Sequence, residues 1–284
     1  MTESTCTQCI TGTIHPGQPS GKIESIHGLN VYVTGNHANP KATVVLYSDV
    51  FGLELPNNKL LADSIASQGN YLVYLPDFFE GDPVKLQLAD ILIPVDAKSL
   101  SAITKYTGLL ANVPSFLLWR RRHGFEKTES ACMDFLGKLR RETQEKGSKV
   151  GIVGYCWGGR FAIRAGLERN QIDIGGIKIP LVDAAVALHP SNLAFPEDVE
   201  NLAVPVSYGW GQEDTMSGIK QKGKIEAIHE EEKGKGRKVP EMEHKVYKPG
   251  RHGFAVRGNP DDEDERAALE GSEKQALAWL AKWL

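Results

Sequence analysis

The stretch Gly154-Tyr155-Cys156-Trp157-Gly158-Gly159 places the strongest constraint on how this chain can fold. The apolar run 150–153 before it is typical of a buried strand, and residues 160–167 after it are typical of a helix. A sharp turn from strand to helix holds its central residue above the edge of a sheet, and small flanking residues let neighbouring backbone approach. That central residue is Cys156. The pattern therefore indicates either a thiol nucleophile beside a helix N-terminus or a small buried cysteine behind a core strand.

The composition excludes several classes of protein. The chain has 284 residues, 41% of them hydrophobic, and a formal net charge of −3, so it can form a sizeable core and has no basic excess for nucleic acid. No apolar run approaches the roughly 20 residues of a membrane-spanning helix. The N-terminus lacks the basic and apolar regions of a secretion signal, and four cysteines do not form a disulfide framework in a chain of this length. We expect a soluble, cytoplasmic protein that binds neither nucleic acid nor membrane.

Strand and helix patterns alternate along most of the chain. A hairpin is expected over residues 22–35, with its turn at His27-Gly28. Further strands are expected at residues 43–47, 71–75, 149–153, 183–188, 204–210 and 244–247. Helices are expected at residues 57–66, 126–146, 218–236 and 261–284. This alternation predicts an α/β fold with a doubly wound, mostly parallel sheet flanked by helices.

Two segments depart from the alternation. Residues 1–22 are polar, contain Cys6 and Cys9, and are expected to form a surface arm with ordinary thiols, because the further ligands of a zinc site are missing nearby. Residues 84–125 contain helix-like pieces and an aromatic patch but no strand, which predicts a helical cap insertion over the site. Residues 23–284 are therefore expected to form a single domain with this insertion.

Candidate catalytic side chains follow the predicted strands. Functional groups of open α/β sheets gather at the carboxyl ends of the strands. In this chain those positions hold Asp49, Asp77, Cys156, His189, Asp214 and His252.

The order Cys156, Asp214, His252 is the nucleophile–acid–histidine order of hydrolases built on such sheets. The histidine would move the proton, and the aspartate would orient the imidazole and stabilise its protonated form. Glu213 is a rival for the acid. His189 is a rival for the histidine, ranked second because it precedes Asp214 and is followed directly by a proline.

Several stretches resemble the dienelactone hydrolase family, and the long cap resembles its eukaryotic branch. The similarity runs from about the first hairpin to the C-terminus, without the arm and the cap. The stretches are Tyr47-Ser48-Asp49-Val50-Phe51-Gly52, Pro76-Asp77-Phe78-Phe79, Gly154-Tyr155-Cys156-Trp157-Gly158-Gly159 and His252-Gly253-Phe254.

The resemblance implies an α/β-hydrolase fold and a carboxylic ester hydrolase with a Cys156–Asp214–His252 triad. It also implies an oxyanion hole formed by the backbone N–H groups of Trp157 and Val50.

Two features differ from the family pattern. The bacterial enzymes have a glutamate that gates the thiol until substrate binds, and this chain has the shorter Asp49 in that position. The family's substrate-binding arginine, four residues after the histidine, is Val256 here, with Arg257 next to it. We expect Arg257, Arg251 or the group 120–122 to replace that arginine. The expected substrate-binding residues are Arg257, Phe51, Phe79 and Trp119.

The resemblance and the residues together predict a cysteine hydrolase that opens a small-molecule lactone or enol-type ester through a thioester intermediate. No metal or organic cofactor is expected, and the protein is expected to be a monomer or a homodimer. One alternative is a thioesterase or tailoring hydrolase for a larger apolar acyl or polyketide-like substrate. Another is a ligand-binding or redox-sensing protein whose Cys156 reacts without turnover.

Overall fold

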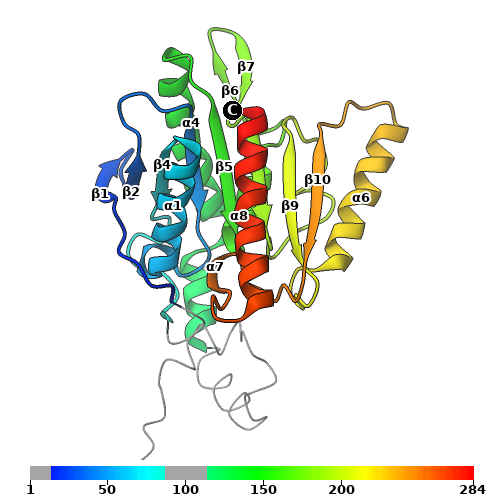
Figure 1. Ribbon diagram of the computed structural model, residues 1–284. Coiled ribbons are helices and arrows are strands. Elements are labelled where there is room, and N and C mark those ends of the chain that lie inside the picture. The colour runs from blue at the N-terminus through cyan, green and yellow to red at the C-terminus, as the bar shows by residue number, and fades with distance from the viewer. Residues whose placement is uncertain (1–13, 87–113) are drawn as a thin grey trace, which may run out of the picture.

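A central eight-stranded sheet organises the computed structural model, which describes residues 14–86 and 114–284 (Figure 1). The strands are β1 (Lys22–Ile26), β2 (Leu29–Gly35), β3 (Thr43–Tyr47), β4 (Leu72–Pro76), β5 (Val150–Tyr155), β8 (Ala184–Leu188), β9 (Val206–Gly211) and β10 (Met242–Tyr247). Their order in the sheet is β1-β2-β4-β3-β5-β8-β9-β10. The hairpin β1–β2 joins β4 in antiparallel fashion, and the pairs from β4 to β10 are all parallel.

Helices cover both faces of the sheet (Figure 1). They are α1 (Pro56–Gly69), α4 (Phe125–Glu145), α5 (Trp157–Ala165), α6 (Ile219–Gly234), the short α7 (Phe254–Arg257) and α8 (Glu263–Trp283). A 3-10 turn, η2, covers Gly52–Glu54, and residues 114–122 are also helical. Side chains of β3 alternate between two apolar clusters, as the period of a strand requires. Val44 and Leu46 pack on the α1 and α8 side, and Val45 and Tyr47 pack on the α4 and α5 side.

The predicted α/β fold is confirmed, with element ends that differ by a few residues. The hairpin turn lies at His27-Gly28, where both residues have a positive φ. A second, two-stranded sheet was not predicted from the sequence; it pairs β6 (Gln171–Ile174) with β7 (Ile177–Pro180). Its turn is Gly175-Gly176, with φ of 63° and 84°, and a Gly-Gly pair between apolar residues is a recognised hairpin signal.

The two segments predicted to form an arm and a cap are described only in part. Residues 1–13, with Cys6 and Cys9, and residues 87–113 lie outside the described residues. Within the segment 84–125, which the sequence predicts to be a cap, residues 114–122 form a helix that contacts Asp82 through Trp119 and Arg122.

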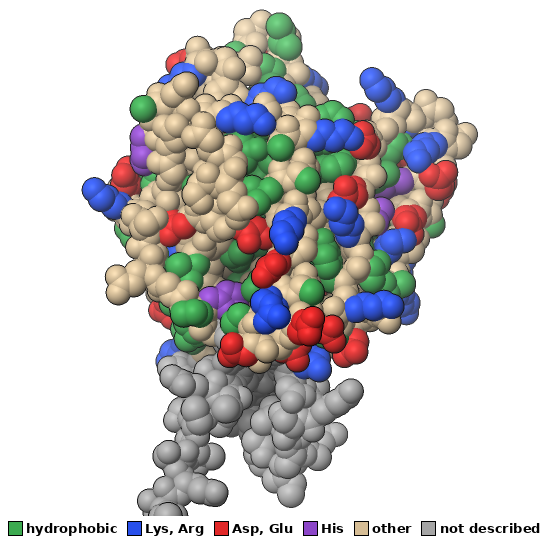
Figure 2. Space-filling view, in the orientation of Figure 1, with side chains coloured by type: hydrophobic (Ala, Val, Ile, Leu, Met, Phe, Trp, Pro, Cys, Tyr) green, Lys and Arg blue, Asp and Glu red, His purple; other side chains and the backbone are tan. Residues whose placement is uncertain are grey.

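Charges are mixed on the face of the molecule shown in Figure 2. Basic and acidic side chains are interspersed there over α8 and the neighbouring strands, without a continuous basic patch. Within residues 14–86 and 114–284, every helix is too short or too polar to cross a bilayer.

Candidate active site

The turn between β5 and α5 has the geometry that the glycine pattern predicts. Cys156 lies at φ 50° and ψ −112°, a conformation that costs a non-glycine residue about 1–3 kcal/mol. A Cβ atom at Gly154 would lie 2.4 Å from the carbonyl oxygen of Gly158, and one at Gly158 would lie 2.2 Å from that of Tyr47. The glycines are therefore required by close backbone approach, and they let the Cys156 side chain stand above the end of β5.

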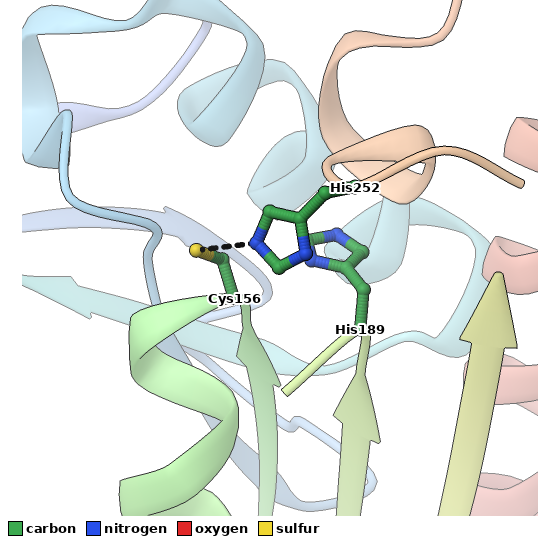
Figure 3. A group of neighbouring side chains, drawn as sticks. All are labelled: Cys156, His189 and His252. Atoms are coloured by element: carbon green, nitrogen blue, oxygen red, sulfur yellow. Dashed lines mark hydrogen bonds between the residues drawn. The ribbon is translucent and has the colours of Figure 1, made fainter. Parts of the chain in front are cut away.

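Three predicted side chains form a continuous chain of contacts. The Cys156 Sγ atom lies 3.1 Å from Nε2 of His252, and Nδ1 of His252 lies 2.8 Å from Oδ2 of Asp214 (Figure 3 shows the first contact). All three residues are buried. The other Asp214 oxygen, Oδ1, accepts hydrogen bonds from the backbone N–H groups of Met216 and Ser217, each at 2.8 Å, so the carboxylate is held in place.

The surroundings favour a protonated His252. Burial by itself would lower the pKa of His252, but the Cys156 sulfur as a thiolate and the Asp214 carboxylate outweigh it and raise the pKa to about 10. Burial raises the pKa of Asp214, but the His252 hydrogen bond and charge outweigh it, and the net shift is downward. A histidine held between a cysteine sulfur and a carboxylate is the arrangement by which a cysteine nucleophile can be activated.

The two rival residues, Glu213 and His189, occupy different places. The Glu213 side chain is 51% exposed and lies 3.6 Å from Arg251, whereas Asp214 is buried and makes the contact with His252. His189, at the end of β8, is fully buried and its ring centroid lies 5.2 Å from that of His252. Geometry thus pairs His252 with Asp214 and leaves His189 as a second histidine beside the pair.

Asp49 lies beside the turn that carries Cys156. The Gly158 N–H donates to the Ser48 carbonyl at 3.1 Å, which joins the loop after β3 to the start of α5. Asp49 is buried, and its Oδ1 accepts 3.0 Å hydrogen bonds from the Phe51 N–H and from Nδ2 of Asn58. Burial raises the pKa of Asp49, against the opposing hydrogen bonds and the Arg257 charge. Asp49 therefore caps its own loop here, and no local sequence pattern pointed to Asn58 as its partner.

The aromatic residues predicted to bind substrate lie in two places. Phe79 packs 4.8 Å from the Trp157 ring and 5.4 Å from the Trp119 ring, and Phe116 stacks on Trp119 at 5.7 Å. We call these four residues the aromatic cluster; it runs from Trp157, next to Cys156, to the helix 114–122. Phe51 lies elsewhere, with the Arg257 guanidinium 5.4 Å from its ring centroid.

The candidate arginines differ in what they contact. Arg257 is buried, at the end of α7. Arg251 lies 3.4 Å from Oε1 of Glu265, and Arg122 forms a bidentate pair with Asp82 at 2.7 and 3.1 Å. The side chains of Arg120 and Arg121 are exposed. Among these, Arg257 lies by the Asp49 loop, since its guanidinium is 5.4 Å from the Phe51 ring centroid and its charge opposes the rise in the pKa of Asp49 that burial causes.

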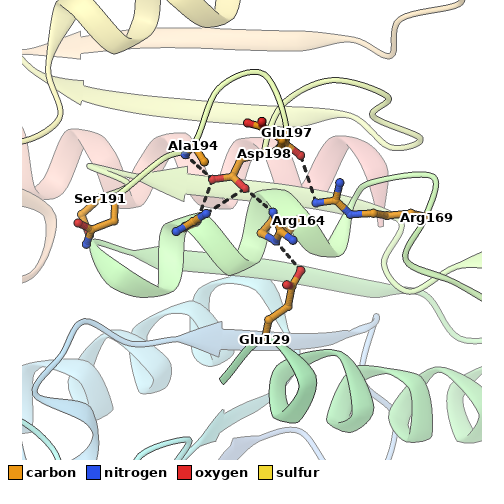
Figure 4. A network of polar contacts seen from close by, with 9 residues as sticks. Glu129, Arg164, Arg169, Ser191, Ala194, Glu197 and Asp198 are labelled. Carbon is orange, nitrogen blue, oxygen red and sulfur yellow. Dashed lines mark hydrogen bonds and ion pairs between the residues drawn. The ribbon is translucent and has the colours of Figure 1, made fainter. Parts of the chain in front are cut away.

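A buried ion-pair network, which was not predicted from the sequence, holds α5. Asp198, fully buried, accepts from Nε of Arg160 at 2.6 Å, from the Ala194 N–H at 2.7 Å and from Arg164, which also binds Glu129 (Figure 4). Asp198 lies in a loop after β8, and no local pattern marks it as buried. The network fixes the helix whose first turn follows Cys156.

Replacing Asp198 by alanine is expected to lower the free energy of unfolding by about 3–5 kcal/mol, because it leaves two arginines without their buried counter-charge. Urea unfolding measures the change. Glu197→Ala is the matched control, since that side chain is exposed and only its backbone carbonyl binds Arg169. Equal unfolding midpoints for the two variants would contradict the role assigned to the network.

The mostly parallel sheet, its flanking helices and the turn at Cys156 define an α/β-hydrolase fold. Solved structures agree. A putative dienelactone hydrolase from Klebsiella pneumoniae superposes with a TM-score of 0.58 at 18% identity, over 90% of this chain and 93% of the other. A dienelactone hydrolase from Anabaena variabilis gives a TM-score of 0.56 at 16% identity, over 94% of this chain and all of the other.

Sequence comparison identifies the family. The model of the Dienelactone hydrolase family matches residues 29–284, so the chain belongs to this family and is a hydrolase of the dienelactone hydrolase type. Hydrolase pyvD of Aspergillus violaceofuscus is 28% identical over 97% of this chain and 96% of its own length. Dienlactone hydrolase 1 of Gibberella moniliformis is 28% identical, over 97% and 93%. The carboxymethylenebutenolidase homolog of Xenopus tropicalis is 26% identical, over 93% and 91%.

Proposed function

We propose that this protein is a cysteine-dependent hydrolase that opens a lactone or enol-type ester through a thioester acyl-enzyme. The observation that carries the proposal is the unbroken contact from Cys156 Sγ through His252 to Asp214, at 3.1 and 2.8 Å. A thiol, a base within hydrogen-bond reach and a group that orients the base are the parts that covalent catalysis by cysteine needs.

In the proposed reaction the Cys156 thiolate attacks the carbonyl carbon of the ester. The tetrahedral intermediate collapses and expels the ring or enol oxygen, which takes the proton from Nε2 of His252. Neutral His252 then removes a proton from water, whose hydroxyl adds to the thioester carbonyl. Expulsion of the thiolate releases the acid and restores the thiolate and the imidazolium. Asp214 keeps Nδ1 protonated throughout.

The backbone N–H groups of Trp157 and Val50 are the proposed oxyanion donors. Support comes from the Gly158–Ser48 hydrogen bond, which brings the loop after β3 next to the start of α5. One such donor contributes roughly 10²–10³ to kcat, because it is already oriented when charge develops on the oxygen.

The aromatic cluster favours a larger, partly apolar substrate. The four rings extend from Trp157, next to Cys156, and would favour a substrate with an apolar part. They support a thioesterase or tailoring hydrolase as the second candidate function. The name of one relative, Dienlactone hydrolase 1 of Gibberella moniliformis, favours the lactone substrate. Buried Arg257, near the Asp49 loop, supports a carboxylate-bearing small ester.

A turnover panel tests the function. Turnover rates of small lactones and enol esters are compared with those of long-chain acyl thioesters. Mass spectrometry of the quenched enzyme shows whether an acyl group is attached to Cys156. The proposal predicts turnover of the small esters and a transient acyl adduct. Faster turnover of the long thioesters would favour the second candidate, and an adduct that never turns over would favour a binding or redox-sensing protein.

Asp49 is proposed to gate the thiol, and Asp49→Ala is expected to speed iodoacetamide labelling of Cys156 in the free enzyme while lowering lactone turnover. A carboxylate near the sulfur disfavours the thiolate, so removing it should move the labelling-against-pH profile to lower pH. Labelling rates are measured against pH for both forms.

Asp77→Ala is the matched control for this experiment. Asp77 follows the neighbouring strand β4 and caps its loop in the same way, accepting from the Phe79 N–H at 3.1 Å and the Gly81 N–H at 2.8 Å. It should lose stability without a change in the labelling profile. If Asp49→Ala behaved in the same way, Asp49 would be only a loop cap.

A further inference from the structure

His189 is a buried histidine that the proposed reaction does not use. Its side chain is fully buried, and within residues 14–86 and 114–284 neither ring nitrogen has a hydrogen-bond partner. A buried polar group left in this way costs about 1–3 kcal/mol, and its backbone φ of 39° adds strain. Such a cost at the carboxyl edge of the sheet calls for a functional explanation.

His189 faces the reacting atoms. Its ring, the Cys156 sulfur and the His252 ring converge from the ends of β5, β8 and the loop after β10 (Figure 3). One ligand atom from each of the three residues, sulfur or ring nitrogen, lies within 4.8 Å of the other two, and all three residues are buried. Because neither ring nitrogen of His189 takes part in a hydrogen bond among the described residues, the imidazole can offer a lone pair to a ligand at this point.

We propose that Cys156, His189 and His252 form a binding site for a thiophilic divalent cation, best fitted by Zn²⁺, that reversibly silences the hydrolase. Zinc binds one thiolate at about 2.3 Å and imidazole nitrogens at about 2.0–2.1 Å, so tetrahedral ligand atoms are about 3.3–3.7 Å apart. The Sγ–Nε2 separation of 3.1 Å is already close to that spacing, and His189 needs a shift of at most about 1.5 Å.

The surroundings of the three ligands also suit zinc. Histidines that bind metal commonly donate their other N–H to a carboxylate, and Nδ1 of His252 lies 2.8 Å from Asp214. A water molecule would complete the tetrahedron. The cation would take the sulfur and Nε2 lone pairs, and the proton held between those atoms would pass to solvent. Nucleophile and base would both be blocked until the metal is removed.

The test uses the full-length, metal-stripped protein and does not depend on turnover. Zn²⁺ is titrated in competition with a chromophoric chelator, and X-ray absorption of the zinc-loaded protein counts the ligands. The proposal predicts one sulfur at about 2.3 Å and two histidine nitrogens at about 2.0–2.1 Å. Co²⁺ should give a thiolate-to-metal absorption band that Cys156→Ser abolishes. One sulfur with a single histidine, or a Co²⁺ spectrum without that band, would overturn the proposal.

His189→Asn removes the proposed third ligand. Asparagine is chosen because it tolerates a positive φ better than most residues. The variant should bind zinc at least roughly tenfold more weakly. Replacing a residue that only hydrogen-bonds to a metal ligand already lowers metal affinity by about 10–100-fold. His37→Asn, at an exposed histidine, is the matched control and should bind as the wild type does. Equal zinc affinity for His189→Asn and wild type would overturn the site. If zinc binds as expected but no ester is hydrolysed, only the proposed function fails.

Discussion

Replacing Cys156 by alanine is expected to lower kcat for the preferred ester by about 10⁴-fold or more while leaving the fold intact. Alanine fits the strained turn between the two glycines but offers no sulfur to attack the carbonyl. Cys156→Ser is expected to keep a trace of activity, because Nε2 of His252 is placed to deprotonate a hydroxyl. Steady-state kinetics and circular dichroism measure the two parts of this expectation.

Cys132→Ala is the matched control for Cys156→Ala. Cys132 is the other free cysteine of the described residues, fully buried in α4, and burial raises the pKa of its thiol well above the usual value. Its replacement should cost some stability and leave kcat nearly unchanged. Full activity in folded Cys156→Ala would refute the covalent mechanism.

Asp214→Asn is expected to lower kcat by about 10⁴-fold with little change in stability, because the amide stabilises the wrong tautomer of His252. Glu213→Gln is the matched control, one residue away, exposed and facing Arg251. It should be nearly neutral. Kinetics of both variants, with unfolding midpoints, separate catalysis from folding. The reverse outcome, a mild Asp214→Asn and a severe Glu213→Gln, would show that the acid is Glu213.

Most of the fold was predictable from local sequence patterns. The buried strands β3 and β5 are recognisable as mostly apolar runs. The glycines around Cys156 indicate the turn, because the close approach of backbone there leaves no room for a Cβ atom. The hairpin β6–β7 was missed although Gly175-Gly176 marks it. Its strands have only four residues each and are partly exposed, so the apolar signal is weak.

The candidate site was predictable only as a set of positions. A residue that follows a strand of a parallel sheet lies at the carboxyl edge, so the strand pattern alone was enough to group Cys156, Asp214 and His252. The distances between them depend on which strands are neighbours. The order β5-β8-β9-β10 supplies that information, and no local pattern contains it.

By itself, the sequence determined the α/β alternation, the thiol on its strained turn and the order of nucleophile, acid and histidine, because these follow from short-range sterics and periodicity. Only the tertiary structure decided that Asp214 rather than Glu213 meets His252, that Asp198 is buried between two arginines, and that His189 faces the Cys156 sulfur. Each of these depends on which side chain of a loop turns inward. Packing between elements distant in the chain decides that direction, and adjacent residues such as 213 and 214 have almost the same local sequence.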